Sequence, residues 1–321
     1  MRVLVTGSTS LFGGTIVNQL IDRGDDVSVF QRHPSGIDVL EHLGDVADAD
    51  AVSGAVTGVE AVIHVAGLAS VSGAWETFES TNVIGTRNVI DAARRNGVSR
   101  FVQISSPSVA YVGKSLIGAS AGSADPTTTR GHYATSKAIA EQLALAADSS
   151  DVSVVAIRPH LIWGPGDTQL IGRIVDRARR GRLAIVGTGA ALIDTTYIDN
   201  AADAAIAALD GALDLGGRSF VVTNGQPRPI GELINRIVMS AGIAPPRIKV
   251  PYRAAKTGGS VAERIWERRS TDSDPPMTSF LAEQLGTAHW FDQRETREAL
   301  GWVPSVSLAE GFTRLAASYE A

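Results

Sequence analysis

Short apolar runs alternate with longer stretches of helical periodicity through much of the 321-residue chain. Runs rich in valine and isoleucine predict six strands, namely Arg2–Val5, Val27–Phe30, Ala61–Val65, Phe101–Ser105, Val152–Ile157 and Ser219–Val222. Between them, three stretches carry apolar residues at helical spacing, namely Gly14–Arg23, Asn82–Asn96 and Tyr133–Ala147. Strands that alternate with helices favour right-handed βαβ units. We therefore expect an α/β fold built on a Rossmann-type, doubly wound parallel sheet.

The domain organisation follows from glycine and proline, which become more frequent after the fifth predicted strand. We expect a dinucleotide-binding Rossmann domain over residues 1–160, with residues 194–225 returning to it through the strand near Phe220. Residues 161–193 and 226–321 would then form a smaller, interleaved substrate-capping region.

Composition argues against several kinds of partner. The net charge of −5 favours neither nucleic acid nor an anionic membrane surface. The absence of cysteine excludes disulfides and thiolate sites, and the six histidines lack metal-ligand spacing, so we expect no metal. No apolar run has the roughly 18 residues of a membrane helix. Because the first predicted strand starts at Arg2, no signal peptide precedes it. We expect a cytoplasmic protein.

A glycine-rich turn follows the first predicted strand. Such a turn lets backbone N–H groups meet a pyrophosphate at a helix N-terminus, although a merely structural tight turn is the alternative. Ser10 stands where the middle glycine of the dinucleotide fingerprint is usual, and its hydroxyl could bond a phosphate oxygen. The residues that we assign to cofactor binding here are Gly7, Ser10, Leu11, Phe12 and Gly13.

The second predicted strand ends without the acid that NAD-selective sites use to bind the ribose hydroxyls. Gln31 and Arg32 stand there instead. A guanidinium can pair with a 2′-phosphate, so we predict that NADP is favoured over NAD, with a solvated loop arginine as the alternative. Asp45 is expected to accept from the adenine amino group, with Val46 beside it, although Asp45 could equally be an exposed loop acid.

The strand expected beside the centre of the cofactor ends in the sequence His64-Val65-Ala66-Gly67. We assign His64, Ala66 and Gly67 to cofactor binding.

A tyrosine and a lysine lie four residues apart on a predicted helix and therefore on one face. These are Tyr133 and Lys137. A phenol with a pKa of about 10 is a poor base near neutrality, so lowering it by ~3 units would need about 4 kcal/mol from the ammonium and a positive nicotinamide ring. Ser106, at the end of a predicted strand, could hold the substrate oxygen while Tyr133 moves its proton. This set is typical of general acid–base catalysis beside a hydride carrier.

Taken in order, these motifs resemble those of a known superfamily. The residues that carry the resemblance are Gly7, Gly13, Asp45, Asn82, Ser106, Tyr133 and Lys137. The whole chain resembles an extended short-chain dehydrogenase/reductase of the NAD-dependent epimerase/dehydratase superfamily. Stretches such as ISSPSVAYVG, IRPHLIWGPGD and HWFDQRETREALGWVPSVSLAEGF are similar to its 3β-hydroxysteroid dehydrogenase branch, which includes sterol-4α-carboxylate dehydrogenases and bacterial β-keto-acid reductases.

The resemblance implies a role for each residue of the set. Tyr133 would be the acid/base, Lys137 would hold the nicotinamide ribose and lower the pKa of the tyrosine, and Ser106 would orient the reacting oxygen. Asn82 would support the active site and cofactor, although asparagine also suits a helix N-cap. Pro159 would place backbone at the nicotinamide amide. By analogy with the family, a homodimer is expected.

Two other functions remain open. Nucleotide-sugar 4-epimerases tend to carry asparagine three residues after the strand-end arginine, whereas Leu161 follows Arg158 at that distance. Leu161, Ile162 and Trp163 would form an apolar wall beside the substrate, or simply core packing. A non-catalytic dinucleotide-binding regulator is the second alternative. We expect an NAD(P)-dependent oxidoreductase that interconverts a secondary alcohol and a ketone on a largely apolar small molecule, either sterol-like or a β-hydroxy/β-keto acid.

Overall fold

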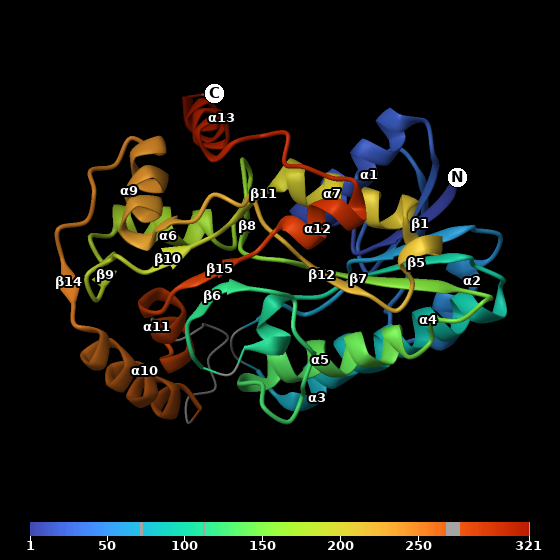
Figure 1. Ribbon diagram of the computed structural model, residues 1–321, viewed down its shortest axis with the longest axis horizontal. Coiled ribbons are helices and arrows are strands. Elements are labelled where there is room, and N and C mark those ends of the chain that lie inside the picture. The colour runs from blue at the N-terminus through green and yellow to red at the C-terminus, as the bar shows by residue number, and fades with distance from the viewer. Residues whose placement is uncertain (71–72, 112, 268–276, 321) are drawn as a thin grey trace.

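A seven-stranded parallel sheet forms the centre of the larger part of the molecule (Figure 1). The computed structural model describes residues 1–70, 73–111, 113–267 and 277–320. The strand order of the seven-stranded sheet is β12-β7-β5-β4-β1-β2-β3. The strands are β1 (Arg2–Thr6), β2 (Asp26–Gln31), β3 (Leu40–Leu43), β4 (Ala61–His64), β5 (Arg100–Ile104), β7 (Ser153–Pro159) and β12 (Ser219–Val222).

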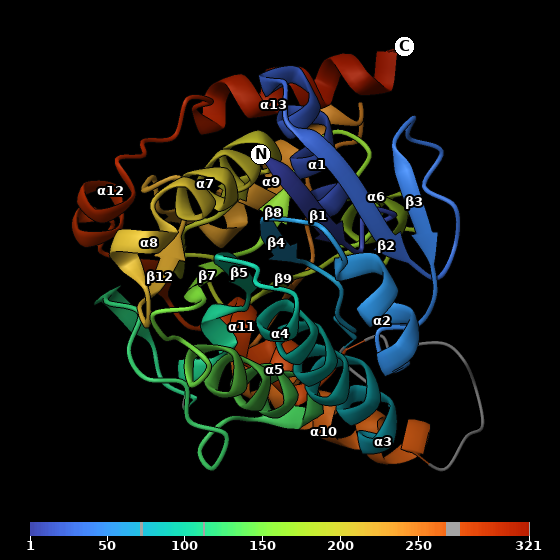
Figure 2. The same cartoon turned by 90° about the vertical axis from the view of Figure 1, so that its right-hand side faces the viewer.

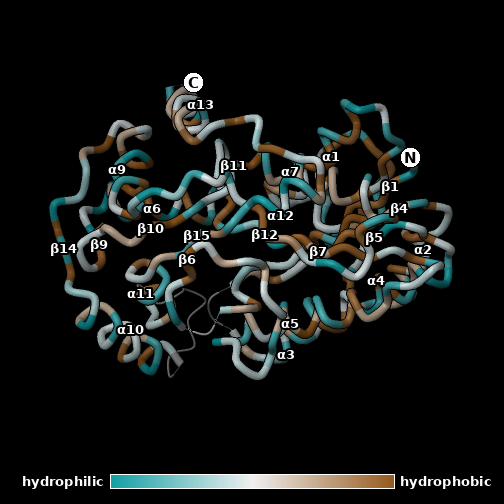
Figure 3. Tube along the Cα trace, viewed as in Figure 1, coloured by the Kyte–Doolittle hydropathy of each residue, from teal (hydrophilic) through white to brown (hydrophobic). Residues whose placement is uncertain are grey.

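Helices cover both faces of this sheet, which explains why its strands are apolar runs rather than alternating ones. Successive side chains of β1 enter different cores, because Val3 and Val5 belong to one cluster and Leu4 to the other. Figure 2 shows α1 and α7 on one face and α2, α4 and α5 on the other. These helices are α1 (Leu11–Arg23), α2 (Ala49–Val56), α4 (Gly85–Arg95), α5 (Gly131–Leu145) and α7 (Ile198–Asp210). Figure 3 shows hydrophobic residues concentrated along the central strands.

A smaller four-stranded sheet, in the order β13-β10-β15-β6, lies beside the large one. Its strands are β6 (Leu116–Ala119), β10 (Leu192–Ile193), β13 (Arg228–Pro229) and β15 (His289–Phe291). Two further strand pairs consist of β8 (Ile162–Trp163) with β11 (Thr196–Tyr197), and of β9 (Ile185–Val186) with β14 (Lys249–Val250).

The helices of this second part are α6 (Ile171–Arg179), α9 (Ile230–Ser240), α10 (Tyr252–Glu267), α11 (Ser279–Gly286), α12 (Arg294–Leu300) and α13 (Leu308–Glu320). Most of them lie around the small strands (Figure 1), whereas α12 packs against α7 and β12 of the larger part. Short elements complete the chain, namely α3 (Trp75–Phe78), the π-helical turn η1 (Glu79–Ile84), the 3₁₀ turn η2 (Pro107–Ala110) and α8 (Ala212–Leu215). None of the helices described here is long and apolar enough to cross a membrane.

The α/β class and the Rossmann-like parallel sheet are confirmed, with two differences from the expectation. The six-strand prediction omits β3, because this edge strand is half exposed and has no apolar run. Residues 116–119 fall within the predicted Rossmann segment, yet β6 pairs with β15 of the small sheet. The proposed domain boundaries stay a prediction, and residues 268–276 of the capping region lie outside the described residues.

A buried ion pair joins α5 to β7. Arg158 donates to Glu141 through Nε to Oε2 at 2.8 Å and through Nη2 to Oε1 at 2.5 Å, with both side chains only 1% exposed. The remaining Nη1 donates to the backbone oxygens of Ala121 and Gly122. The guanidinium thereby ties the helix, the strand and a loop together.

Replacing Arg158 by methionine leaves the Glu141 carboxylate buried without its partner, which costs about 3–5 kcal/mol of unfolding free energy. Urea denaturation measures this loss. The matched control is Arg180→Met, since Arg180 forms an exposed i,i+4 pair with Asp176 and such pairs contribute about 0.3–0.5 kcal/mol. Equal losses in the two variants would contradict the prediction.

Candidate active site

The reactive groups meet at the carboxyl end of β5. Ser106 follows this strand in an extended conformation and begins η2, where its hydroxyl accepts from the Ser108 hydroxyl at 3.0 Å and from the Ser108 N–H at 3.3 Å. Tyr133 lies in the first turn of α5, close enough to Ser106 for the serine side chain to affect the pKa of its phenol. The structure thus brings together a serine and a tyrosine that are 27 residues apart in the sequence.

The electrostatics of Tyr133 differ from the expectation. Burial raises the pKa of its phenol above the ordinary value of 10, and the neighbouring Ser106 side chain acts in the opposite direction. The expected lowering by Lys137 is not found within the protein itself, because burial disfavours the phenolate. The protein alone therefore holds Tyr133 as a neutral phenol that can donate a proton.

Lys137 lies one turn after Tyr133 and is buried. Its ammonium donates to the backbone oxygen of Ile104 at 2.5 Å, and Ile104 ends the strand that leads to Ser106. Burial lowers the pKa of Lys137 to about 8, while the charge of Glu141 acts the other way. The lysine therefore fixes α5 against the end of β5.

Asn82 connects α5 to the loop after β4. Its Oδ1 accepts from the Leu68 N–H at 2.7 Å, and its Nδ2 donates to the Leu68 oxygen at 3.1 Å and to the Ser136 hydroxyl at 2.8 Å. Ser136 in turn donates to the backbone oxygen of Tyr133 at 2.9 Å. The N-cap interpretation of Asn82 is wrong, because Asn82 lies inside the π-helical turn η1 and its amide is buried. Such π-turns are frequent at functional sites.

Gly67 lies between the side chains of Asn82 and Lys137. A Cβ built on Gly67 would lie 3.2 Å from Asn82 Oδ1 and 3.6 Å from Lys137 Nζ. The assigned residues Gly67, Asn82 and Lys137 therefore converge at one point beside Ser106 and Tyr133.

The turn after β1 is closed by two glycines. A Cβ on Gly7 would lie 2.8 Å from the backbone of Ala66, and a Cβ on Gly13 would overlap the Gly7 carbonyl. Gly7 also has a φ of +79°, which favours glycine. The end of β1, the start of α1 and the loop after β4 can approach one another because these positions lack side chains.

The start of α1 presents free donors to this turn. Within the described part of the chain, the N–H groups of Leu11 and Phe12 have no hydrogen-bond partner. A pyrophosphate fits such a helix N-terminus because the N–H groups and the helix dipole favour anions. The Ser10 hydroxyl accepts from Gly13 N–H at 3.0 Å and donates to the Gly7 oxygen at 2.8 Å. It therefore caps α1 rather than offering its proton to a phosphate.

The end of β2 is organised around Gln31. This buried amide accepts from the Ser8 hydroxyl at 2.5 Å and donates to Glu41 at 2.6 Å, while Ser35 also donates to Glu41. Hydrogen bonds from Ser35 come first among the causes that lower the pKa of Glu41. Arg32 follows with an exposed side chain.

Asp45 and Val46 lie in the loop between β3 and α2. Asp45 is exposed and accepts from the Ala47 N–H at 2.9 Å. Val46 is buried against Gly85, where an added Cβ would lie 2.6 Å from Val46 Cγ2. Their cofactor contacts stay a prediction.

His64 is buried within the protein. Its Nδ1 lies 2.8 Å from Thr6 Oγ1 and its Nε2 lies 3.1 Å from Thr86 Oγ1. Since Ala66 N–H donates to the same Thr6 oxygen at 3.1 Å, the histidine joins the ends of β1 and β4. Burial, followed by the charge of Lys137, lowers the pKa of His64 to about 3. The sequence does not single out Thr6 or Ser136 as site residues, because isolated hydroxyl residues form no motif.

Pro159 ends β7, opposite Val222 of β12. His160 follows, and its Nδ1 lies 2.5 Å from the backbone oxygen of Asp194. Leu161 comes next with a φ of +46° and an exposed side chain. Trp163 does not form part of an apolar wall, because its ring is buried against neighbouring aromatic rings. These are Tyr197 and Phe312.

The model of the 3-beta hydroxysteroid dehydrogenase/isomerase family matches residues 4–252. The chain belongs to this family. It is 41% identical to the 2-alkyl-3-oxoalkanoate reductase of Stenotrophomonas maltophilia over 99% of both chains. It is also 29% identical to the decarboxylating sterol-4-alpha-carboxylate 3-dehydrogenase of Mus musculus, over 99% of this chain and 91% of the relative.

Solved structures agree on the fold. A short-chain dehydrogenase/reductase superfamily protein from Agrobacterium tumefaciens with bound NAD has a TM-score of 0.77 at 20% identity, over 100% of this chain and 97% of that chain. As a member of the family, this protein is an NAD(P)-dependent oxidoreductase. The alternative of a non-catalytic regulator is therefore set aside.

The burial of His64 predicts acid lability. The unfolded chain protonates this histidine near pH 6.5, whereas the folded protein does so only near pH 3. Unfolding therefore takes up about one proton between these values, and stability falls as the pH falls below 6.5. From pH 6.5 to pH 5 the loss from His64 is about 2 kcal/mol. Denaturant unfolding at several pH values should show a flatter profile for His64→Gln than for the exposed control His33→Gln, and equal profiles would contradict this.

Proposed function

We propose that this oxidoreductase interconverts a β-keto acid and the corresponding β-hydroxy acid on a largely apolar alkyl substrate. The observation that carries the proposal is the placement of Tyr133 beside Ser106 at the carboxyl end of β5. The identity of 41% to a 2-alkyl-3-oxoalkanoate reductase, over 99% of both chains, supports this substrate class over a sterol.

Each side chain of the site has a separate role in the proposed reaction. The hydroxyl of Ser106 orients the ketone oxygen, and Tyr133 donates its phenolic proton to that oxygen as the alcohol forms. Because burial raises the pKa of Tyr133, the phenol remains protonated and ready to donate. When bound, the nicotinamide cofactor supplies the hydride to the ketone carbon. Lys137 and Asn82 hold the helix and the loop around this position, and Lys137 is available to the nicotinamide ribose.

The dinucleotide would lie along the carboxyl ends of the strands. Gly7, Leu11, Phe12 and Gly13 would surround its pyrophosphate. Toward the adenine end, Asp45 and Val46 would contact the base. Toward the nicotinamide, the backbones of His64, Ala66, Gly67 and Pro159 would provide contacts. A homodimer remains an expectation from the family.

Replacing Tyr133 by phenylalanine removes the proton donor and keeps the ring. We expect kcat to fall by about 10²–10⁴-fold, with the dissociation constant of the cofactor unchanged. Reduced-nicotinamide absorbance measures turnover, and fluorescence titration measures binding. The exposed Tyr319→Phe variant is the control. Full turnover by Tyr133→Phe would refute the assignment.

We also propose that NADP is favoured over NAD, because Arg32 is exposed and Gln31 replaces the usual acid. Replacing Arg32 by alanine should lower the ratio of kcat/KM for NADP to that for NAD by about 10–100-fold, the contribution of a charged hydrogen bond. Arg95→Ala, an exposed change at the end of α4, should leave the ratio unchanged. A wild-type preference for NAD would overturn this proposal.

A further inference from the structure

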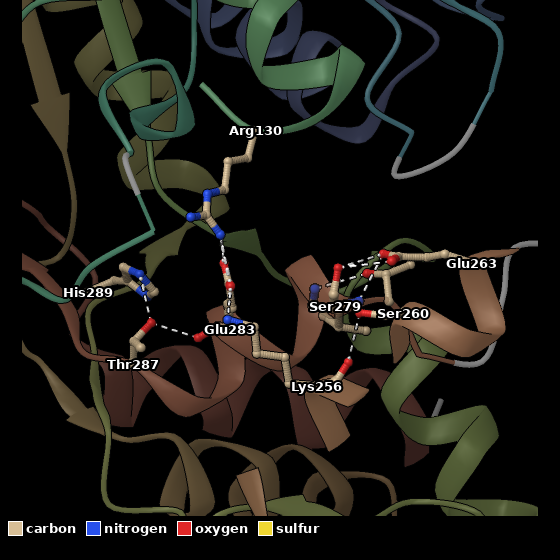
Figure 4. Close-up of polar contacts among 10 residues, drawn as sticks. Arg130, Lys256, Ser260, Glu263, Ser279, Glu283, Thr287 and His289 are labelled. Carbon is tan, nitrogen blue, oxygen red and sulfur yellow. Dashed lines mark hydrogen bonds and ion pairs between the residues drawn. The ribbon is translucent and has the colours of Figure 1, made fainter. Parts of the chain in front are cut away.

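A buried glutamate on α11 holds two cations (Figure 4). Arg130 Nη1 donates to Glu283 Oε1 at 3.0 Å and to Oε2 at 3.1 Å, and Lys256 Nζ lies 2.7 Å from Oε1. The Glu283 side chain is 4% exposed, whereas those of Arg130 and Lys256 are 52% and 44% exposed. The trio carries one net positive charge.

The position of Arg130 relates this trio to the reaction. Arg130 is the residue before α5 and lies three residues before Tyr133, whereas Glu283 and Lys256 belong to α11 and α10. The Arg130–Glu283 pair therefore connects the start of α5 to the second part of the molecule, between residues 153 apart in the sequence. Lys256 and Glu283 both belong to that second part.

A glycine in a neighbouring loop also helps to position the guanidinium of Arg130. Gly113, in the loop that continues from Ser106, has a φ of +80°, and a Cβ there would lie 2.6 Å from Arg130 Cζ. The guanidinium therefore packs against the backbone of this loop, in space that only glycine leaves open. Glu283 and Gly113 together fix its orientation.

The hydrogen-bonding capacity of Arg130 is only partly used. An arginine has five N–H donors, and in the portion of the chain described here only Nη1 makes hydrogen bonds. The edge formed by Nε and Nη2 retains its donors, and this edge matches a carboxylate in a bidentate arrangement. Lys256 offsets the charge of Glu283, so the positive charge of Arg130 remains for a second anion.

We infer that the Nε and Nη2 edge of Arg130 binds the carboxylate of the β-keto acid substrate. The inference rests on the proposed function. In such a substrate one carbon separates the carboxylate from the ketone carbon, so a cation on the segment that leads into the Tyr133 helix suits it. Arg130 then determines specificity for acids over esters and simple ketones, and Glu283 and Lys256 position and balance it.

The test compares a 2-alkyl-3-hydroxy acid with its methyl ester, each oxidised with NADP while reduced-nicotinamide absorbance is followed. The hydroxy acid is used because β-keto acids lose carbon dioxide on standing. The hydride passes from the carbinol carbon to the cofactor and the hydroxyl proton passes to the protein, so no other oxidant is needed. The ratio of kcat/KM for acid to that for ester is the readout.

We expect wild type to prefer the acid and Arg130→Met to lower the ratio by about 10–100-fold, through a higher KM for the acid and with little change for the ester. Arg130→Lys keeps the positive charge but lacks the paired N–H donors of the guanidinium. It should therefore restore part of the acid-to-ester ratio of kcat/KM. Arg180→Met is the matched control, since Arg180 forms an exposed pair with Asp176 away from this cluster, and it should retain the preference for the acid.

Three other outcomes would contradict either the inference or the proposed function. If Arg130→Met loses acid and ester turnover equally, or only lowers the melting temperature, the arginine is a structural strap and the inference fails. If wild type oxidises the acid but the Arg130→Met ratio is unchanged, the inference fails while the proposed function stands. If wild type oxidises neither compound but does oxidise a sterol, the proposed substrate class fails.

Discussion

The buried side-chain amide of Asn82 is the contact on which the arrangement of the site depends. It bonds both backbone groups of Leu68 and the hydroxyl of Ser136, which reaches the first turn of α5. The loop after β4 and the helix of Tyr133 are thereby joined through one residue. A buried amide satisfied on both ends rigidifies its surroundings, and loss of either end would leave an unpaired polar group.

The rest of the site assembles by the same means, with buried polar groups at the ends of parallel strands. Lys137 reaches the end of β5, His64 joins the ends of β1 and β4, and Gln31 joins β2 to β3 through Glu41. Each interaction lies at the carboxyl edge of the sheet, where open α/β folds bind ligands. Apolar packing in the interior positions the strands, and the buried polar contacts at their carboxyl ends position the residues of the site.

The sequence predicts well what depends on local pattern. The apolar runs predict the central strands, and the spacing of Tyr133 and Lys137 predicts their common helix, because both arise within a few residues. It does not predict β3, whose pairing depends on a neighbour rather than on its own composition. It also does not predict the burial that raises the pKa of Tyr133, or the contact of Arg130 with Glu283, because these depend on segments brought together only by folding.

The pairing of β6 with β15 has a consequence for how molecules enter and leave. The strand β6 begins ten residues after Ser106 in the chain and is hydrogen-bonded to β15 of the smaller sheet. A hinge motion that separated β15 from β6 would have to break this ladder. Local rearrangement of individual loops leaves the ladder intact, so it is the less costly route for exchange of substrate and product.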